Sequence, residues 1–369
     1  MLRIQCLRFI RHKKRYVVLF FLIATIIYML YMSGEFIPLP GFVMDIYYWI
    51  NPAKGVFCHY YKQKDSLPDI SEFHPKKGES IFFHETSCTS FINGKIFITA
   101  RQACAVESAA RMNPDHEVYL LYASPGKFVF ENSESDRFIQ ELMKYSNVNI
   151  FHVDLSEYFK GSPIEDLWAN GKLRQSKYAQ SHTSDALRFL TLWKYGGIYL
   201  DLDVIVIKNL NQLSTDFSGV ESDKAVAAGI LGFNHTGKGH EFAASCLGDL
   251  KYNFKGYKWG WNGPGTITRL LKKLCKADNV NSMVNKTCDG YTIYPPESFY
   301  VIRWWEWERF FNPKYLEYVR NVSSKSYIIH VWNKFSSSTR IPINAEDIPY
   351  LEFAKEFCPN IVKQCDVFF

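Results

Sequence analysis

The sequence has nine cysteines but no Cys-x-x-Cys pair. Structural zinc sites are usually built from such pairs, so a zinc site is not expected. The sequence also has little net charge after residue 15. It contains 43 Lys+Arg and 37 Asp+Glu, and the six basic residues of positions 1–15 account for the whole excess. The basic balance therefore gives no indication of nucleic-acid binding.

The amino terminus has no acidic residue in positions 1–15, and a run of mainly apolar residues without a charge follows at 16–32. This run is near the short limit for crossing a bilayer and suits the thinner membranes of the early secretory pathway. No Ala-x-Ala-like cleavage site follows it, so a retained signal anchor is predicted, with the basic residues in the cytosol. We expect a single-pass type II membrane protein with a cytosolic tail (1–15), a transmembrane helix (16–32), a stem (33–77) and a luminal domain (78–369).

The expected stem is rich in proline but also in aromatic residues, so part of it packs on the domain or lies at the membrane surface. Eight cysteines follow the expected span, and an even number in an oxidising lumen predicts disulfide bonds, although the sequence does not choose the pairs. Three Asn-x-Ser/Thr sequons, at Asn234, Asn285 and Asn321, are predicted glycosylation sites. Asn285 and Asn321 are favoured because we expect them in polar loops.

The stretch 184–208 combines a helix pattern with a strand pattern. Thr183 or Ser184 can cap the helix, Asp185 would lie in its first turn, and two glycines at 196–197 would end it. A buried strand is predicted at 198–207, with Asp201 and Asp203 as its only charged residues before Lys208.

Residues i and i+2 of a strand point to the same side, so Asp201 and Asp203 would project together. Neighbouring carboxylates among apolar residues repel each other, and a divalent cation relieves this repulsion. Oxygen ligands suit Mn²⁺ or Mg²⁺, which keep open positions for substrate phosphates. Asp185 and Arg188, three residues apart on the helix, form either a polar pair that binds hydroxyls or an ordinary surface ion pair.

The string S-D-x-x-R followed by Y-G-G-x-Y-x-D-x-D resembles the donor-binding region of the α1,4-glycosyltransferase family, glycosyltransferase family 32. The resemblance implies a UDP-sugar donor and a retaining, metal-dependent transfer. It implies that Asp203 is a metal ligand and that Asp201 contacts the ribose or donor sugar. It further implies that Asp185 and Arg188 hold sugar hydroxyls and that Tyr199 lies beside the nucleotide.

Alternating strand and helix patterns before this stretch predict an α/β fold with a mainly parallel sheet covered on both faces. The resemblance implies the GT-A type of Rossmann-like nucleotide-binding domain. Ligands of such sheets bind beyond the carboxyl ends of the strands, so His84, Glu85 and Thr86 are expected at the nucleotide. An equally good interpretation is a polar strand end. The expected strands are 81–88, 117–123 and 148–153, and the expected helices are 99–112 and 135–145.

A glycine-rich turn leads into a predicted helix at 259–269, and backbone N–H groups at such a helix start can bind phosphate or carbohydrate oxygens. The resemblance covers this turn. We expect Asn262, Gly263 and Pro264 at the active site, with Trp259 or Trp261 stacking on a sugar. The alternative is a tight turn with core tryptophans.

The tryptophan-rich segment 303–307, interpreted as a strand, is either an aromatic platform for the acceptor or core packing. A last strand, 326–331, leads into His330-Val-Trp-Asn-Lys334, which the resemblance also covers. His330 or Asn333 is therefore a candidate second metal ligand, and Lys334 could offset diphosphate charge.

The donor stays open among UDP-galactose, UDP-N-acetylgalactosamine and UDP-N-acetylglucosamine, which differ by one hydroxyl or one acetamido group. The resemblance favours α1,4 transfer of galactose or N-acetylgalactosamine to a glycosphingolipid. The alternatives are α1,4-N-acetylglucosamine transfer to glycoprotein glycans, and a non-catalytic Golgi protein of this fold that binds a sugar nucleotide.

Overall fold

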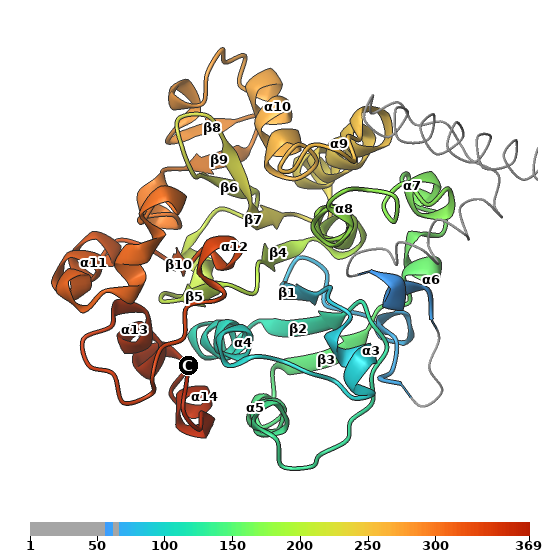
Figure 1. Cartoon of the computed structure of the whole chain (residues 1–369). Coiled ribbons are helices and arrows are strands. Elements are labelled where there is room, and N and C mark those ends of the chain that lie inside the picture. Colours follow the sequence, from blue (N-terminus) through green and yellow to red (C-terminus); the bar gives the residue numbers. More distant parts are fainter. Residues whose placement is uncertain (1–55, 62–65) are drawn as a thin grey trace, which may run out of the picture. The chain divides into compact units, whose positions relative to one another are not determined.

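A computed structural model describes residues 56–61 and 66–369. Its centre is an eight-stranded sheet with the order β3-β2-β1-β4-β7-β6-β9-β8, beside a two-stranded sheet of β10 and β5 (Figure 1). The strands are β1 Ser80–Glu85, β2 Glu117–Tyr122, β3 Val148–His152, β4 Gly197–Leu200, β5 Val204–Val206, β6 Phe217–Val220, β7 Val226–Phe233, β8 Lys286–Cys288, β9 Tyr291–Tyr294 and β10 Ile328–His330.

The first half of the large sheet is parallel, because β1 pairs in parallel with both β2 and β4, and β2 pairs in parallel with β3. The second half is mixed. There β7 runs antiparallel to β4 and β6, β9 runs parallel to β6, and β8 runs antiparallel to β9. The predicted α/β class is confirmed, with a sheet that is parallel for the most part and mixed at one side.

Helices cover both faces of this sheet, as Figure 1 shows. Side chains of β1 alternate between the two cores: Ile81 and Phe83 lie in one and Phe82 in the other, all fully buried. The helices are α3 Thr89–Asn93, α4 Ala100–Met112, α5 Glu134–Leu142, α6 Leu155–Phe159, α7 Glu165–Ala169, α8 Ala179–Tyr195, α9 Gly237–Asn253, α10 Pro264–Leu274, α11 Leu316–Ser323, α12 Asn333–Ser336, α13 Pro349–Phe357 and α14 Pro359–Gln364.

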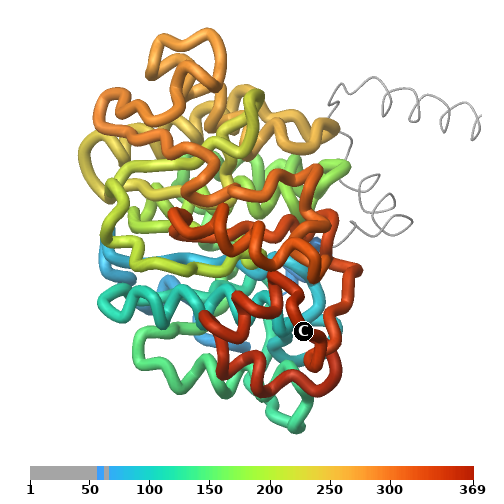
Figure 2. Tube along the Cα trace, turned by 90° about the vertical axis from the view of Figure 1, so that its left-hand side faces the viewer, coloured from blue at the N-terminus to red at the C-terminus, as the bar shows by residue number. Residues whose placement is uncertain are grey.

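The carboxyl-terminal segment closes one face of the molecule. Helices α13 and α14 pack on α4, and Figure 2 shows the end of the chain beside the early helices. Glu107 of α4 accepts hydrogen bonds from the N–H groups of Asn360 and Ile361 at the start of α14, at 3.2 and 2.8 Å. A Cys104–Cys358 disulfide joins the same two regions, which lie 254 residues apart in the sequence.

The prediction of disulfide bonds is confirmed for six cysteines. Besides the pair that holds the carboxyl terminus, Cys58 bonds to Cys88 and Cys275 bonds to Cys288. Cys246 is buried and Cys365 half-buried as free thiols. The tertiary structure thus supplies the pairing that the sequence left open.

Part of the expected stem packs on the domain. Tyr60 stacks on Trp168 with ring centroids 4.4 Å apart, and Ile70 is fully buried. The expected cytosolic tail, the expected transmembrane helix and residues 33–55 lie outside the described residues. Among residues 56–61 and 66–369, no helix has the length and apolar character needed to span a bilayer.

The three sequons lie in different settings. Asn285 is exposed just before β8, and Asn234 is half-buried with its side-chain oxygen accepting the N–H of Thr236. Asn321 is exposed, but it lies in α11, so the expectation of a loop there was wrong.

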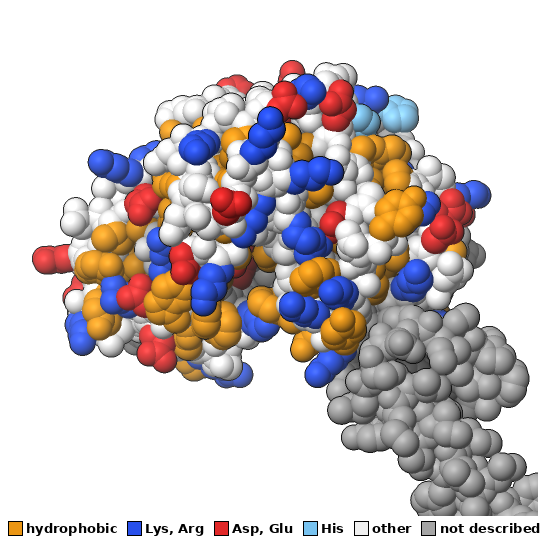
Figure 3. All heavy atoms as spheres, turned by 90° about the horizontal axis from the view of Figure 1, so that it is seen from above, with side chains coloured by type: hydrophobic (Ala, Val, Ile, Leu, Met, Phe, Trp, Pro, Cys, Tyr) orange, Lys and Arg blue, Asp and Glu red, His pale blue; other side chains and the backbone are white. Residues whose placement is uncertain are grey.

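Around the upper face over α9 and α10, basic and acidic side chains are intermingled, in keeping with the balanced charge after residue 15 (Figure 3).

Two boundaries in the central stretch differ from the prediction. Helix α8 begins at Ala179 and its N-cap is Tyr178, so Thr183 and Ser184 do not cap it and Asp185 lies in its second turn. The polar sequence of the first turn has no apolar periodicity that could reveal it. The end of the helix is as predicted: Gly196 and Gly197 have positive φ, and a Cβ on Gly197 would lie 2.3 Å from the carbonyl oxygen of Ser80.

The strand predicted at 198–207 is wrong as one strand. It consists of β4 and β5, which belong to different sheets and are separated by 201–203. The N–H of Asp201 still donates to Gly229 of β7 at 2.8 Å, whereas the carbonyl of Asp203 accepts from Val331 after β10 at 2.9 Å. The chain changes sheets within these three residues, and so the two carboxylates lie at a turn.

Candidate active site

A cavity of about 880 Å³ lies beyond the carboxyl ends of β1 and β4. Thr86, which follows β1, and Asp201, which follows β4, both line it. This is the edge at which a parallel sheet of this kind binds ligands. The predicted position of the site is therefore the position of the cavity.

Three side chains in the cavity form a group that can hold a metal ion. Ligand atoms of Asp201, Asp203 and His330 lie within 4.8 Å of one another. The Nε2 atom of His330 is 3.1 Å from Oδ1 of Asp203 and 3.9 Å from Oδ2 of Asp201. Antiparallel pairing of β10 with β5 places His330 opposite Val204, directly beside the two aspartates.

Asn333 completes this group. Its backbone N–H donates to Oδ2 of Asp203 at 2.7 Å, and its buried side-chain oxygen has no hydrogen-bond partner within the described part of the chain. Two carboxylates, an imidazole and an amide oxygen without a partner fit a divalent cation such as Mn²⁺ or Mg²⁺. Both predicted candidates for the further ligand, His330 and Asn333, thus lie next to Asp203.

Opposite charges stabilise the group of Asp201, Asp203 and His330 when no cation is bound. Burial lowers the pKa of His330, but the carboxylates of Asp203 and Asp201 outweigh burial and raise this pKa to about 10. Burial raises the pKa of Asp201, yet Arg188 and His330 overcome it and lower that pKa to about 2. A protonated imidazole therefore balances the carboxylates, and a bound cation would take over this role.

A second network adjoins the first through Asp201. Nη1 of Arg188 lies 3.2 Å from Oδ1 of Asp201, and Nη2 lies 3.6 Å from Oδ1 of Asp185. The Tyr199 hydroxyl donates to Oδ1 of Asp201 at 2.7 Å, and the Arg188 guanidinium lies 4.7 Å above the Tyr199 ring. Asp185 and Arg188 are each only 7% exposed and line the cavity, so they are not an ordinary surface ion pair.

Burial also changes the proton affinity of Asp185. It raises the pKa of Asp185 to about 6, although Arg188 acts in the opposite direction. The close approach of the loop at Gly263 contributes to this burial, because a Cβ there would lie 2.2 Å from Oδ1 of Asp185. Gly263 thus lets the loop close over a buried carboxylate, and the predicted contact with phosphate or carbohydrate oxygens stays a prediction.

Of the three residues at the end of β1, Thr86 lines the cavity. His84 does not line the cavity. Its Nε2 atom lies 3.1 Å from Oγ1 of Thr191, and its ring centroid lies 5.1 Å from that of Tyr199. Burial, followed by the charge of Arg188, lowers the pKa of His84 to about 3, so this histidine is neutral. Glu85 is buried and accepts the N–H of Ser87, and burial raises its pKa to about 7. The structure therefore brings Thr86, and neither His84 nor Glu85, to the cavity.

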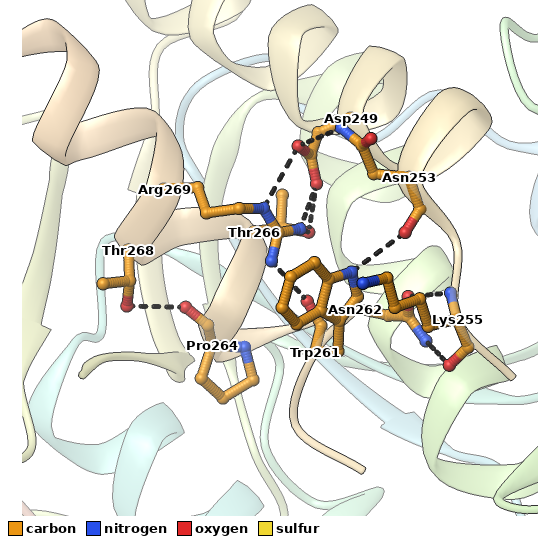
Figure 4. Close-up of polar contacts among 9 residues, drawn as sticks. All are labelled: Asp249, Asn253, Lys255, Trp261, Asn262, Pro264, Thr266, Thr268 and Arg269. Atoms are coloured by element: carbon orange, nitrogen blue, oxygen red, sulfur yellow. Dashed lines mark hydrogen bonds and ion pairs between the residues drawn. The ribbon is translucent and has the colours of Figure 1, made fainter. Parts of the chain in front are cut away.

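The predicted glycine-rich turn is present, and Pro264 begins α10. The polar side chains of the turn form hydrogen bonds within the protein (Figure 4). The side-chain amide of Asn262 bonds to both the N–H and the carbonyl of Lys255, at 3.0 and 3.1 Å. Trp261 donates to the carbonyl of Asn253 at 2.9 Å, and its ring faces the guanidinium of Arg269 at 4.2 Å. Asn262 and Trp261 are thus framework residues in this structure.

Of the two tryptophans, Trp259 reaches the cavity. It lines the cavity together with Pro264, and its side chain is 46% exposed. The ammonium of Lys334 lies 2.9 Å from the centroid of its ring. This contact joins the loop before α10 to α12.

Segment 303–307 is not a strand: residues Trp304–Phe311 form a 3-10 helix, η6. Trp304 lines the cavity, is 42% exposed and stacks on Phe335 at 5.6 Å, whereas Trp307 packs against the core. The interpretation as core packing is therefore confirmed for Trp307, and the interpretation as an acceptor platform stays a prediction for Trp304. The error about the strand arose because alternation cannot be judged over five residues of which three are tryptophan.

Sequence reasoning missed Glu221 and Tyr300, which also line the cavity. Glu221 follows β6 as one acidic residue in a polar turn, and burial raises its pKa to about 7 against the effects of His330 and Arg303. Tyr300 is buried, and its hydroxyl has no hydrogen-bond partner among residues 56–61 and 66–369. Neither residue belongs to a motif, so no sequence signal identified them.

Two family models match the chain. The "Alpha 1,4-glycosyltransferase conserved region" matches residues 235–365, and the "Glycosyltransferase sugar-binding region containing DXD motif" matches residues 99–218. The human lactosylceramide 4-alpha-galactosyltransferase is 35% identical over 296 residues, covering 79% of this chain and 79% of that protein. The human alpha-1,4-N-acetylglucosaminyltransferase is 27% identical over 260 residues, covering 70% and 74%.

Among solved structures, the galactosyltransferase LgtC in complex with donor and acceptor sugar analogs matches at 13% identity and a TM-score of 0.33. The match covers 77% of this chain and 95% of that one. The sequence relatives establish the identity that the motifs predicted. The chain belongs to the α1,4-glycosyltransferase family and is a DXD-motif glycosyltransferase.

Proposed function

We propose that this protein transfers galactose or N-acetylgalactosamine from a UDP-sugar, in α1,4 linkage and with retention, to a glycosphingolipid. The observation that carries this proposal is the junction of two networks at Asp201. One network can hold a cation and the other can hold sugar hydroxyls. A UDP-sugar has a diphosphate, which needs the cation, and a hexose, which needs groups that bind hydroxyls. The two networks must therefore lie next to each other. The 35% identity to lactosylceramide 4-alpha-galactosyltransferase supports the choice of donor and acceptor.

In this proposal Asp203, His330 and Asn333 hold a Mn²⁺ or Mg²⁺ ion, with Asp201 beside it. The cation offsets the charge that develops on the leaving diphosphate. Arg188 and Asp185 bind the hydroxyls of the donor sugar, and their burial keeps them oriented before the substrate arrives. Lys334 lies at the cavity and adds positive charge on the diphosphate side.

Two alternatives follow from specific observations. The 27% identity to alpha-1,4-N-acetylglucosaminyltransferase favours N-acetylglucosamine transfer to glycoprotein glycans as the second candidate. A non-catalytic Golgi protein that binds a sugar nucleotide would use the same donor network. In all three cases we propose a type II Golgi membrane protein whose sugar-nucleotide-binding domain lies in the lumen, with glycans at Asn285, Asn321 and Asn234.

The test is UDP release by the detergent-solubilised full-length protein with each of the three UDP-sugars, in the presence and absence of Mn²⁺. Lactosylceramide, a terminal-N-acetylgalactosamine glycolipid and a glycoprotein glycan serve as acceptors. We expect turnover of UDP-galactose or UDP-N-acetylgalactosamine with a glycolipid, and none by Asp203→Ala. Asp223→Asn is the matched control, because Asp223 is an exposed acidic residue that does not line the cavity. Binding of UDP and Mn²⁺ without turnover of any donor would favour the non-catalytic alternative.

A further inference from the structure

Four carboxylates line the cavity, and one of them differs from the others. Asp185 and Asp201 lie beside Arg188, and Asp203 contacts both His330 and the Asn333 N–H. The fourth, Glu221, has a carboxylate that forms no salt bridge or hydrogen bond with any residue in the described part of the chain. A cavity carboxylate without a partner is available to a ligand.

The backbone of Glu221 is nevertheless fixed. Its N–H donates to the carbonyl of Ala225 at 3.1 Å, and its carbonyl accepts from Nη1 of Arg303 at 2.9 Å. Arg303 directly precedes Trp304, the aromatic residue of η6 that lines the cavity. One arginine therefore ties the position of the carboxylate to the position of the aromatic ring.

Glu221 carries no positive charge in either protonation state, and this limits what it can bind. The cation group and Lys334 already provide the positive charge that a diphosphate needs. Arg188 and Asp185 are the buried pair suited to the donor hexose. Glu221 is therefore left for a neutral ligand group that donates a hydrogen bond, such as a sugar hydroxyl.

Trp304 has the complementary property. Its ring is 42% exposed, is supported from one side by Phe335 at 5.6 Å, and faces the same cavity. The C–H face of a pyranose packs on a ring of this kind. We infer that Glu221 and Trp304 form the acceptor subsite: the Glu221 carboxylate accepts a hydrogen bond from a hydroxyl of the acceptor's terminal sugar, and Trp304 packs on that sugar's apolar face.

This inference rests on the proposed transferase function, and it names the part of the cavity that function would use for the acceptor. Glu221 lines the same cavity as Asp201 and His330, so an acceptor hydroxyl bound to Glu221 lies in the cavity that contains the cation group. An acceptor must approach the donor at the bond to the diphosphate, and a subsite at this place satisfies that requirement.

The experiment compares Glu221→Ala and Glu221→Gln with the control Asp223→Asn, two residues away in the same turn, in the detergent-solubilised full-length protein. Lactosylceramide is varied at saturating donor, and the donor is then varied at saturating lactosylceramide. We expect Glu221→Ala to raise the acceptor KM about tenfold or more while the donor KM and UDP affinity change less than about twofold. Glu221→Gln keeps an acceptor oxygen and is expected to have a smaller effect. Asp223→Asn is expected to match the wild type.

Trp304→Ala and Trp304→Phe provide the second arm, with the thermal unfolding midpoint as the check on folding. Trp304→Ala is expected to raise the acceptor KM, and Trp304→Phe to restore most of the loss. An unchanged acceptor KM in Glu221→Ala overturns the inference, and so does an equal rise in the donor KM.

Saccharide binding measured by saturation-transfer NMR with UDP and Mn²⁺ present keeps the inference separate from the proposed function. Lactose and terminal N-acetylgalactosamine oligosaccharides are the probes. If the wild type turns over no donor but binds one of these saccharides and Glu221→Ala does not, the proposed function fails and the subsite stands. A wild type that binds neither saccharide overturns the subsite.

Discussion

The two sides of the cavity differ in how their polar groups are satisfied. On the side that we propose binds the donor, Asp185, Arg188, Tyr199 and Asp201 are connected to one another. On the other side, the carboxylate of Glu221 has no ion-pair or hydrogen-bond partner among the described residues, and partly exposed aromatic rings line the same cavity. Groups that fix each other in the absence of substrate are preorganised, and they tolerate little change. Isolated groups can be exchanged at low cost to the fold, so a substitution at Glu221 should change stability less than a substitution within the connected network.

The largest effect is expected from Arg188→Ala, which breaks the donor side. It leaves the buried carboxylate of Asp185 and the half-buried carboxylate of Asp201 without their guanidinium partner, and breaking a buried ion pair typically costs about 3–5 kcal/mol. We expect a clear fall in the thermal unfolding midpoint together with loss of turnover. Arg188→Lys keeps the charge but not the two-sided geometry, so it should fold better and still lose most activity. Arg320→Lys, at the surface pair with Glu356, is the matched control. A fully active Arg188→Lys protein would contradict this prediction.

The next effect is a pH dependence of cation affinity. The pKa of His330, raised to about 10, means that a cation must displace a proton at neutral pH. The Mn²⁺ affinity should therefore rise with pH, by about tenfold per unit between pH 6 and 8 if one proton is released. Electron paramagnetic resonance titrations of the metal would measure this, with His330→Gln as the comparison. An affinity independent of pH in the wild type would show that His330 is not displaced.

The same raised pKa has a consequence for stability in the metal-free protein. Because the folded pKa of His330 exceeds the ordinary value of 6.5, its contribution to stability is complete below pH 6.5 and is lost as pH rises toward 10. Denaturant unfolding of the wild type without metal should show this loss, and His330→Gln should reduce it. Saturating Mn²⁺ should oppose it.

A smaller effect is expected from Tyr199→Phe, which removes one contact of the donor network, the hydroxyl bond to Asp201. A hydrogen bond to a charged group is typically worth about 1.5–3 kcal/mol, and Arg188 still holds Asp201. UDP and Mn²⁺ affinity should fall by about tenfold. Isothermal titration calorimetry would measure it, with Tyr318→Phe, at an exposed tyrosine, as the control. A loss as large as that of Arg188→Ala would mean that the hydroxyl has a direct role with substrate.

The smallest effect on stability is expected on the acceptor side. Trp304 is partly exposed, so Trp304→Ala removes little buried area and should change the thermal unfolding midpoint by less than about 2 °C. Trp307→Ala, in the same 3-10 helix but packed against the core, should lower the midpoint more. Equal shifts would remove the distinction between the cavity and core tryptophans of η6.

Local patterns in the sequence predicted much of the fold. The first three strands were placed within a few residues, because each is a short apolar run bounded by polar residues. The helix expected at 99–112 is α4, and the structure shows Thr99 as its N-cap, with the hydroxyl accepting the N–H of Gln102. The strand at 198–207 failed because an apolar run cannot show that its two halves enter different sheets.

The same distinction between local patterns and the packing of distant segments applies to the candidate active site. The sequence singled out Asp185, Arg188, Asp201 and Asp203, because charged residues in an apolar stretch carry a cost that a ligand or a partner removes. Their proposed roles came from the family resemblance. The sequence did not show the role of Asn262, since the same residue in the same turn could bind a ligand or the backbone of Lys255. Glu221 had no local signal at all.

The sequence by itself determined the chemistry of this protein: the paired aspartates, the helix that ends at two glycines, and the apolar strands that build the sheet. The tertiary structure alone decided which distant groups join them. Pairing of β10 with β5 brings Asn333 to Asp203 across 130 residues and sets His330 against the same carboxylate. Covalent neighbours fix local geometry through sterics and hydrogen bonds, whereas the meeting of distant segments depends on how all the apolar faces pack at once.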